Sequence, residues 1–219
     1  MNEILPSVVM DSVPNPDACV IWLHGLGADG HDFEPIVPEL RLPSSLRIRF
    51  VFPHAPQRPV TINQGYVMRA WYDITHPDLG QRVDAAGIHQ SRRLIDKLVD
   101  QVIADGIAPA RIILAGFSQG GVIALETGLR RNPPIGGVIA LSTYVALPDE
   151  LPGATSQSPP ILMMHGSEDP LIPLPLAEAS RDLLLSKGYQ VEWHVFPMPH
   201  SVCAEEIAVI RRRLLERLG

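Results

Sequence analysis

The chain is short of cysteine, of basic residues and of long apolar runs, and each shortage excludes a class of protein. Its two cysteines, Cys19 and Cys203, are too few for a disulfide framework, so we expect both to be reduced thiols. Residues 1–6 have neither the basic start nor the apolar core of a secretion signal. No apolar run approaches the length of a membrane span. We therefore expect a cytoplasmic protein without stable membrane insertion.

The charge balance argues against an anionic partner. The 18 lysines and arginines are outnumbered by 24 acidic residues, which gives a net charge of −6. The only basic run, Arg211 to Arg213, falls late in a helical pattern, where cations suit the negative end of a helix. Without a basic face the chain cannot neutralise phosphates, so we do not expect it to bind nucleic acid.

Neither a metal nor a cofactor is predicted. No histidines, cysteines and aspartates stand at the spacing of a metal-ligand set. The glycine-rich stretch from His24 to Gly30 lacks both the G-x-G-x-x-G spacing and an adjacent lysine, which argues against a nucleotide.

Short apolar runs alternate with helical patterns, which indicates an α/β fold. Most of the runs lack polar alternation, as expected for strands buried on both faces, and only the last alternates like a strand near a sheet edge. We expect one domain over residues 1–219, with a mostly parallel central sheet and helices on both faces. The predicted strands cover residues 19–23, 48–52, 111–115, 137–141, 160–165 and 191–196, and the predicted helices cover residues 85–104, 119–130, 176–186 and 204–218.

Two long segments look irregular, and both follow strand ends where ligands bind in open α/β sheets. The first covers residues 54–72 and the second covers residues 143–159. The second is rich in proline and too short for a helical cap domain, so the site should be open.

A serine at a strand-to-helix junction is the strongest indication of chemistry. Ser118 stands in Gly-Phe-Ser-Gln-Gly, directly after an apolar run and before a helical pattern. A serine on such a sharp turn projects its hydroxyl above the sheet, and the first amides of the new helix, beginning with Gln119, are free to bind an anion. The glycines two residues before and after it let the strand and helix backbones pass closely.

A serine nucleophile needs a base and an orienting carboxylate. Glu168 and Asp169 follow the strand at 160–165, and we prefer Asp169 because Asp-Pro continues the turn. Of the eight histidines, His200 alone follows the acid on a strand exit before a helix. The chain order Ser118, Asp169, His200 is that of α/β-hydrolases. His165, which precedes the acid, is expected to be structural, with a hydrogen bond to loop backbone.

The early loop at residues 24–30 is expected to supply the second oxyanion donor, the Leu26 amide. Apolar residues of the irregular segments and the acid loop are candidates for an acyl-binding groove, although a simple packing role fits most of them equally well. Trp71 is favoured as site-lining because it ends the first irregular segment. The candidates are Met68, Trp71, Tyr144, Val145, Leu147, Leu151 and Ile172.

With these pieces the chain resembles the phospholipase/carboxylesterase family of α/β-hydrolases, which includes bacterial carboxylesterases and acyl-protein thioesterases. The resemblance implies Ser118, Asp169 and His200 as the triad, the Leu26 and Gln119 amides as the oxyanion hole, and compatibility with a homodimer. Pro199 departs from the family, which usually has glycine there; proline removes a backbone donor and stiffens the approach to His200. Matching stretches lie at 23–27, 53–56, 59–61, 70–73, 116–121, 165–169 and 200–201.

The predicted activity is that of a serine carboxylesterase that hydrolyses short- to medium-chain esters through an acyl-enzyme. The alternative is an acyl-protein thioesterase or a lysophospholipase, because the resemblance covers all of these; the partner is then a small-molecule ester or an acyl thioester. A remote alternative is a non-catalytic α/β-hydrolase that serves as a binding module. The presence of Ser118, Asp169 and His200 argues against that alternative.

Overall fold

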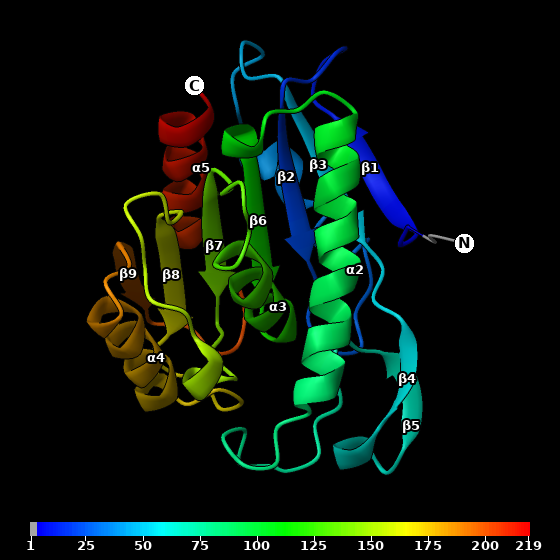
Figure 1. The fold of residues 1–219 in the computed structure, drawn as a ribbon, viewed down its shortest axis with the longest axis vertical. Coiled ribbons are helices and arrows are strands. Elements are labelled where there is room, and N and C mark those ends of the chain that lie inside the picture. Colours follow the sequence, from blue (N-terminus) through cyan, green and yellow to red (C-terminus); the bar gives the residue numbers. More distant parts are fainter. Residues whose placement is uncertain (1–3) are drawn as a thin grey trace.

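The fold is built on a seven-stranded sheet in a computed structural model that describes residues 4–219 (Figure 1). Residues 1–3 of the N-terminal segment considered above lie outside the described residues. The strands of this sheet are β1 (Ser7–Asp11), β2 (Ala18–Leu23), β3 (Ile48–Pro53), β6 (Ile112–Phe117), β7 (Gly137–Leu141), β8 (Ile161–Gly166) and β9 (Val191–Phe196). They lie in the order β1-β3-β2-β6-β7-β8-β9, and only β1 is antiparallel to its neighbour. The prediction of a mostly parallel α/β sheet is confirmed.

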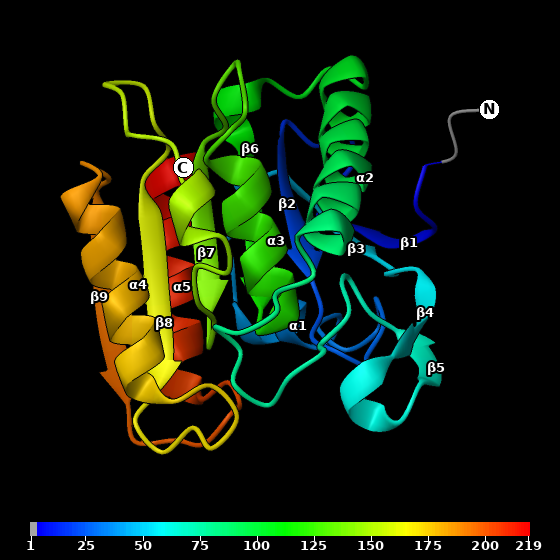
Figure 2. The same cartoon turned by 60° about the horizontal axis from the view of Figure 1, so that its bottom comes forward.

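Helices cover both faces of the sheet (Figures 1 and 2). They are α1 (Ile36–Glu39), α2 (Ala85–Ala104), α3 (Gln119–Gly128), α4 (Leu174–Ser186) and α5 (Ala204–Leu218). One face carries α2, α3 and α4, and the other carries α5 and the short α1. Within residues 4–219, none of the helices has the length and apolar character needed to cross a membrane.

Burial on both faces explains why the central strands have no polar alternation. Every residue of β2, β7 and β8 is buried, and successive side chains enter two separate hydrophobic cores. In β2, Ile21 packs with the core under α2 and α3, whereas Val20 packs with the core under α5. A strand covered on both sides needs apolar residues at every position.

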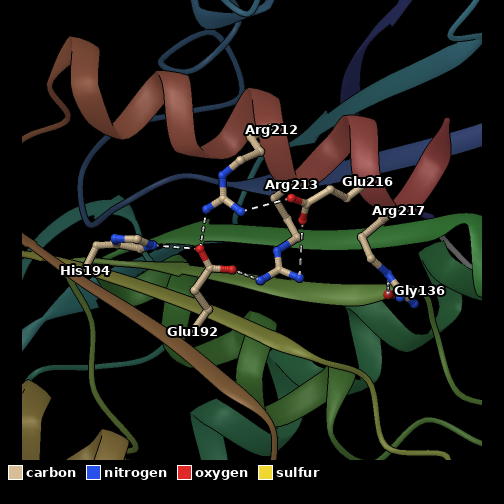
Figure 3. Close-up of polar contacts among 7 residues, drawn as sticks. All are labelled: Gly136, Glu192, His194, Arg212, Arg213, Glu216 and Arg217. Atoms are coloured by element: carbon tan, nitrogen blue, oxygen red, sulfur yellow. Dashed lines mark hydrogen bonds and ion pairs between the residues drawn. The ribbon is translucent and has the colours of Figure 1, made fainter.

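The alternating strand β9 lies at the sheet edge, as predicted. Its Glu192 is surrounded by His194 at 2.7 Å and by the guanidinium groups of Arg212 and Arg213 from α5 (Figure 3). Burial alone would raise the pKa of Glu192, but the hydrogen bonds from His194 and Arg212 outweigh it and lower the pKa to about 2. The basic run therefore pairs largely within the protein, and Arg212 also binds Glu216 at 3.0 Å.

The irregularity predicted for residues 54–72 is wrong in part. The segment contains a separate antiparallel hairpin of β4 (Gln57–Val60) and β5 (Tyr66–Arg69), which projects beside the main sheet (Figure 2). The sequence analysis also missed β1 and α1. Residues 143–159 contain only one 3-10 turn, so this segment forms no helical cap over the end of the sheet.

Candidate active site

The turn between β6 and α3 holds Ser118 in a conformation that non-glycine residues rarely adopt. Its φ is 54° and its ψ is −119°. A conformation of this kind costs about 1–3 kcal/mol and persists only where the surroundings hold it. The backbones around it lie very close: a Cβ on Gly116 would lie 2.3 Å from the Gly120 carbonyl oxygen, and one on Gly120 would lie 2.3 Å from the carbonyl oxygen of Leu23 in β2. The strand and helix therefore meet backbone to backbone, and the serine stands at the apex of the turn.

Asp169 and His200 meet beyond the ends of β8 and β9. The His200 Nδ1 lies 2.6 Å from the Asp169 Oδ2, while the Asp169 Oδ1 accepts the amides of Leu171 and Ile172, each at 2.9 Å. Asp169 is buried and Glu168 is exposed, which distinguishes the two acidic candidates. With Nδ1–H donated to the carboxylate, the Nε2 lone pair of His200 is left to accept a proton. This pair forms with Pro199 in place.

Ser118 and His200 line the same cavity. The Ser118 hydroxyl makes no hydrogen bond to any of residues 4–219, the His200 Nε2 included. Hydrogen bonds between a nucleophile and its base commonly tighten only when substrate binds. The Phe117 ring packs against His200 with 4.7 Å between centroids and supports the imidazole from the side of the serine turn.

Two backbone amides beside the serine are free to bind an oxyanion. Among residues 4–219, no acceptor meets the amide of Leu26 or the amide of Gln119. Both residues line the cavity with Ser118. Gln119 begins α3, so its amide carries the positive end of the helix dipole.

His24 supports the loop that carries the Leu26 amide. Its Nδ1 lies 2.7 Å from the Gly25 carbonyl oxygen, and its Nε2 accepts the Ala55 amide at 3.1 Å. Burial lowers the pKa of His24 to about 4, so the neutral ring donates Nδ1–H to Gly25. Both ring nitrogens are therefore used to hold loop backbone.

His165 supports the acid loop in a similar way. It is fully buried, and its Nε2 lies 2.8 Å from the Ile172 carbonyl oxygen and 3.5 Å from the Asp169 Oδ2. Burial lowers the pKa of His165, so the neutral ring donates Nε2–H to Ile172 and closes the turn around the acid.

The cavity beside Ser118 has a volume of about 550 Å³, which is within the usual range for small-molecule sites. Its walls are largely apolar. The sequence analysis missed Ile62 at the β4–β5 hairpin, Ile74 and Leu79 in the following loop, and Leu171 beside the acid. The signal that could have found them is their place as apolar residues in segments beyond strand ends. In the structure Leu171 is 65% exposed, whereas Ile74 and Leu79 also pack against the core.

Of the predicted groove residues, the structure brings Tyr144 and Ile172 to the cavity wall. The cavity wall does not include Trp71, whose side chain is fully buried, or Val145, Leu147 and Leu151, which pack in the core under α2 to α4. Met68 lies on β5 outside the cavity wall, where its sulfur is near Gly27 and Asn63. Val145, Leu147 and Leu151 thus have the simple packing role that the sequence analysis gave as the alternative.

Residues 4–219 contain no cluster of three or more His, Cys, Asp or Glu side chains arranged to hold a metal ion. The parallel sheet, the strained serine after a central strand and the Asp–His pair at neighbouring strand ends define an α/β-hydrolase.

Comparison with known proteins places the chain within that class. The description of the matching family is Phospholipase/Carboxylesterase, over residues 6–216, and the chain belongs to this family. It is 37% identical over 225 residues to an acyl-protein thioesterase 1 of Neurospora crassa, covering 97% of this chain and 92% of that protein. It is 34% identical over 223 residues to the Gibberella zeae acyl-protein thioesterase 1, covering 96% and 95%.

Solved structures agree with this assignment. The Arabidopsis thaliana SOBER1 crystal structure superposes with a TM-score of 0.84 at 30% identity, covering 92% of this chain and 99% of that one. Esterase PE8 superposes with a TM-score of 0.83 at 28% identity, covering 99% and 100%. The chain is therefore a hydrolase of the esterase and thioesterase type.

Proposed function

We propose that this protein is a serine hydrolase that cleaves acyl thioesters, with Ser118 as the nucleophile, His200 as the base and Asp169 as the orienting acid. The observation that carries the proposal is the hydrogen-bonded Asp169–His200 pair on the wall of a cavity that also contains Ser118. The names of the fungal relatives, acyl-protein thioesterase 1, favour a thioester over an oxygen ester.

In the first half-reaction, His200 Nε2 takes the Ser118 proton while Oγ attacks the acyl carbonyl carbon. The negative charge that develops on the carbonyl oxygen is held by the Leu26 and Gln119 amides. When the tetrahedral adduct collapses, its carbon–sulfur bond breaks and His200 protonates the departing thiolate. Water, deprotonated by His200, then releases the acid from Ser118 and restores the enzyme.

The cavity suits an acyl chain carried by a larger molecule. Ile62, Ile74, Leu79 and Leu171 offer apolar surface, and residues 4–219 form no cap domain over the serine. Each methylene that moves from water to such a surface contributes about 0.8 kcal/mol, which is about a fourfold gain in kcat/KM for each carbon the cavity accepts.

A second candidate is a carboxylesterase for short- to medium-chain esters. The family description and the likeness to esterase PE8 favour it, and the same triad would serve both reactions. Two sets of substrates with matched acyl chains, one of thioesters and one of p-nitrophenyl esters, distinguish the candidates by kcat/KM. The thioesterase proposal requires the higher value for the thioester at each chain length, after correction for the intrinsic reactivity of the leaving groups.

The catalytic assignment is tested by Ser118→Ala. Loss of the nucleophile should lower kcat by about 10⁶-fold, as in other serine hydrolases. The variant should keep the circular dichroism spectrum of the parent and lose labelling by a fluorophosphonate probe. Turnover or labelling at near-parental level would refute Ser118 as the nucleophile.

A further inference from the structure

Trp71 connects the two segments that carry the free amides of the oxyanion site. Its indole Nε1–H donates to the His24 carbonyl oxygen at 2.9 Å, and its backbone N–H donates to the Gln119 side-chain Oε1 at 2.7 Å. His24 lies two residues before Leu26, and Gln119 itself supplies the other free amide. All three of the bonded residues are buried.

Each polar group of this connection is used, so the connection has one geometry. The Gln119 Nε2 donates to the Tyr72 carbonyl oxygen at 2.6 Å, which determines which way the Gln119 amide points. The Ser91 hydroxyl of α2 donates to the Trp71 carbonyl oxygen. Residue 71 is thereby tied at its amide, its carbonyl and its indole to three different elements.

We propose that Trp71 is a positioning residue that holds the Leu26 and Gln119 amides at the separation needed to bind a tetrahedral oxyanion. The proposal rests on the proposed function, because it assumes that these amides act on the reacting carbonyl. Oxyanion donors contribute only when they lie about 2.7–3.1 Å from the charge that develops. If the loop that carries the Leu26 amide shifts when the indole hydrogen bond is lost, the amides stabilise the transition state less well. Binding of the acyl chain is then unchanged.

If Trp71 only filled space, a substitution that retains its packing would leave kcat unchanged. The Trp71 ring lies 5.3 Å from the His24 ring, so it also fills space beside the loop. Phenylalanine at position 71 retains most of that aromatic packing and removes the indole N–H. A matched control exists in Trp22, which is also buried but whose Nε1 has no hydrogen-bond partner among residues 4–219.

The test compares Trp71→Phe with Trp22→Phe for kcat, KM and melting temperature. We expect Trp71→Phe to lower kcat by about 10- to 100-fold, less than the 10²–10³ typical of complete loss of one donor, with KM within about twofold. Affinity for a trifluoromethyl ketone that carries the same acyl chain should fall in parallel with kcat/KM. Trp22→Phe should keep the parental kcat even if its melting temperature falls as far.

Equal kcat values in the two variants would overturn the proposal, as would a loss confined to KM. If Trp71→Phe does not fold, Gln119→Met removes the other half of the connection and retains the residue 119 amide, and it carries the same expectation. Failure of the proposed function is a separate result: an active Ser118→Ala would refute Ser118 as the nucleophile, whereas an inactive Ser118→Ala with unaffected Trp71→Phe would refute only the positioning role.

Discussion

Replacing Glu206 by glutamine should change how the stability of the protein depends on pH. Glu206 lies in the first turn of α5, is fully buried, and has neither carboxyl oxygen in hydrogen-bond geometry with any of residues 4–219. Burial raises the pKa of Glu206 from 4.5 to about 8, and the nearby Cys203 backbone offsets this only in part. The folded protein therefore keeps this carboxyl protonated at neutral pH.

The direction of this pH dependence follows from how many protons Glu206 binds in the folded and in the unfolded chain. Between pH 4.5 and about 8 the folded chain holds a proton on Glu206 that the unfolded chain has released. The free energy of unfolding must then fall as the pH rises through this window. Each pH unit is worth about 1.4 kcal/mol, so the full effect is on the order of 3–5 kcal/mol. For a chain of this size, 1 kcal/mol shifts the melting temperature by about 2–4 °C.

The assay is thermal unfolding of the parent and Glu206→Gln from pH 5 to pH 9. Glutamine resembles the protonated acid, so the two melting temperatures should be similar near pH 5. Above pH 7 we expect the variant to melt at least about 5 °C higher than the parent. The exposed Glu205 in the same turn gives the control Glu205→Gln, which should show no such divergence. Parallel curves for the parent and Glu206→Gln would refute the reasoning.

Two further substitutions test the catalytic pair and the serine turn. Asp169→Asn should lower kcat by about 10⁴-fold, because the amide favours the wrong tautomer of His200; a loss below tenfold in a steady-state ester assay would rule out Asp169 as the orienting acid. Gly120→Ala should abolish soluble folded protein, since its Cβ would lie 2.3 Å from the Leu23 carbonyl oxygen. Gly153→Ala, which has no atom within 4 Å of its added Cβ, is the control, and equal yields of the two would contradict the close approach.

The sequence predicted the strands that are buried on both faces and the alternating strand β9, and it missed the strands that show neither pattern. A continuous apolar run such as Ile112–Phe117 is a strong signal, because both of its faces need apolar side chains. The edge strand Ser7–Asp11 is only partly buried and lacks that signal. The hairpin strand Gln57–Val60 contains a proline and one buried residue, so its pattern resembled a loop.

The site residues that the sequence placed near one another follow strand ends, whose meeting at one edge of a parallel sheet is dictated by topology. Topology does not determine which side chains of a loop face the cavity. The orientation of Trp71 depends on a hydrogen bond to His24, a residue 47 positions away in the chain. The burial of Glu206 depends on how α5 packs against the sheet, and a glutamate in a first helical turn is ordinarily exposed.

The tip and the base of the β4–β5 hairpin contact different parts of the site. The hairpin belongs to a separate sheet, and Ile62 and Asn63 near its tip form part of the cavity wall. Its base is different, because the Arg69 carbonyl oxygen accepts the Gly27 amide next to Leu26. Substitutions at the tip therefore alter the cavity wall without touching the bond that joins the base to the loop of Leu26.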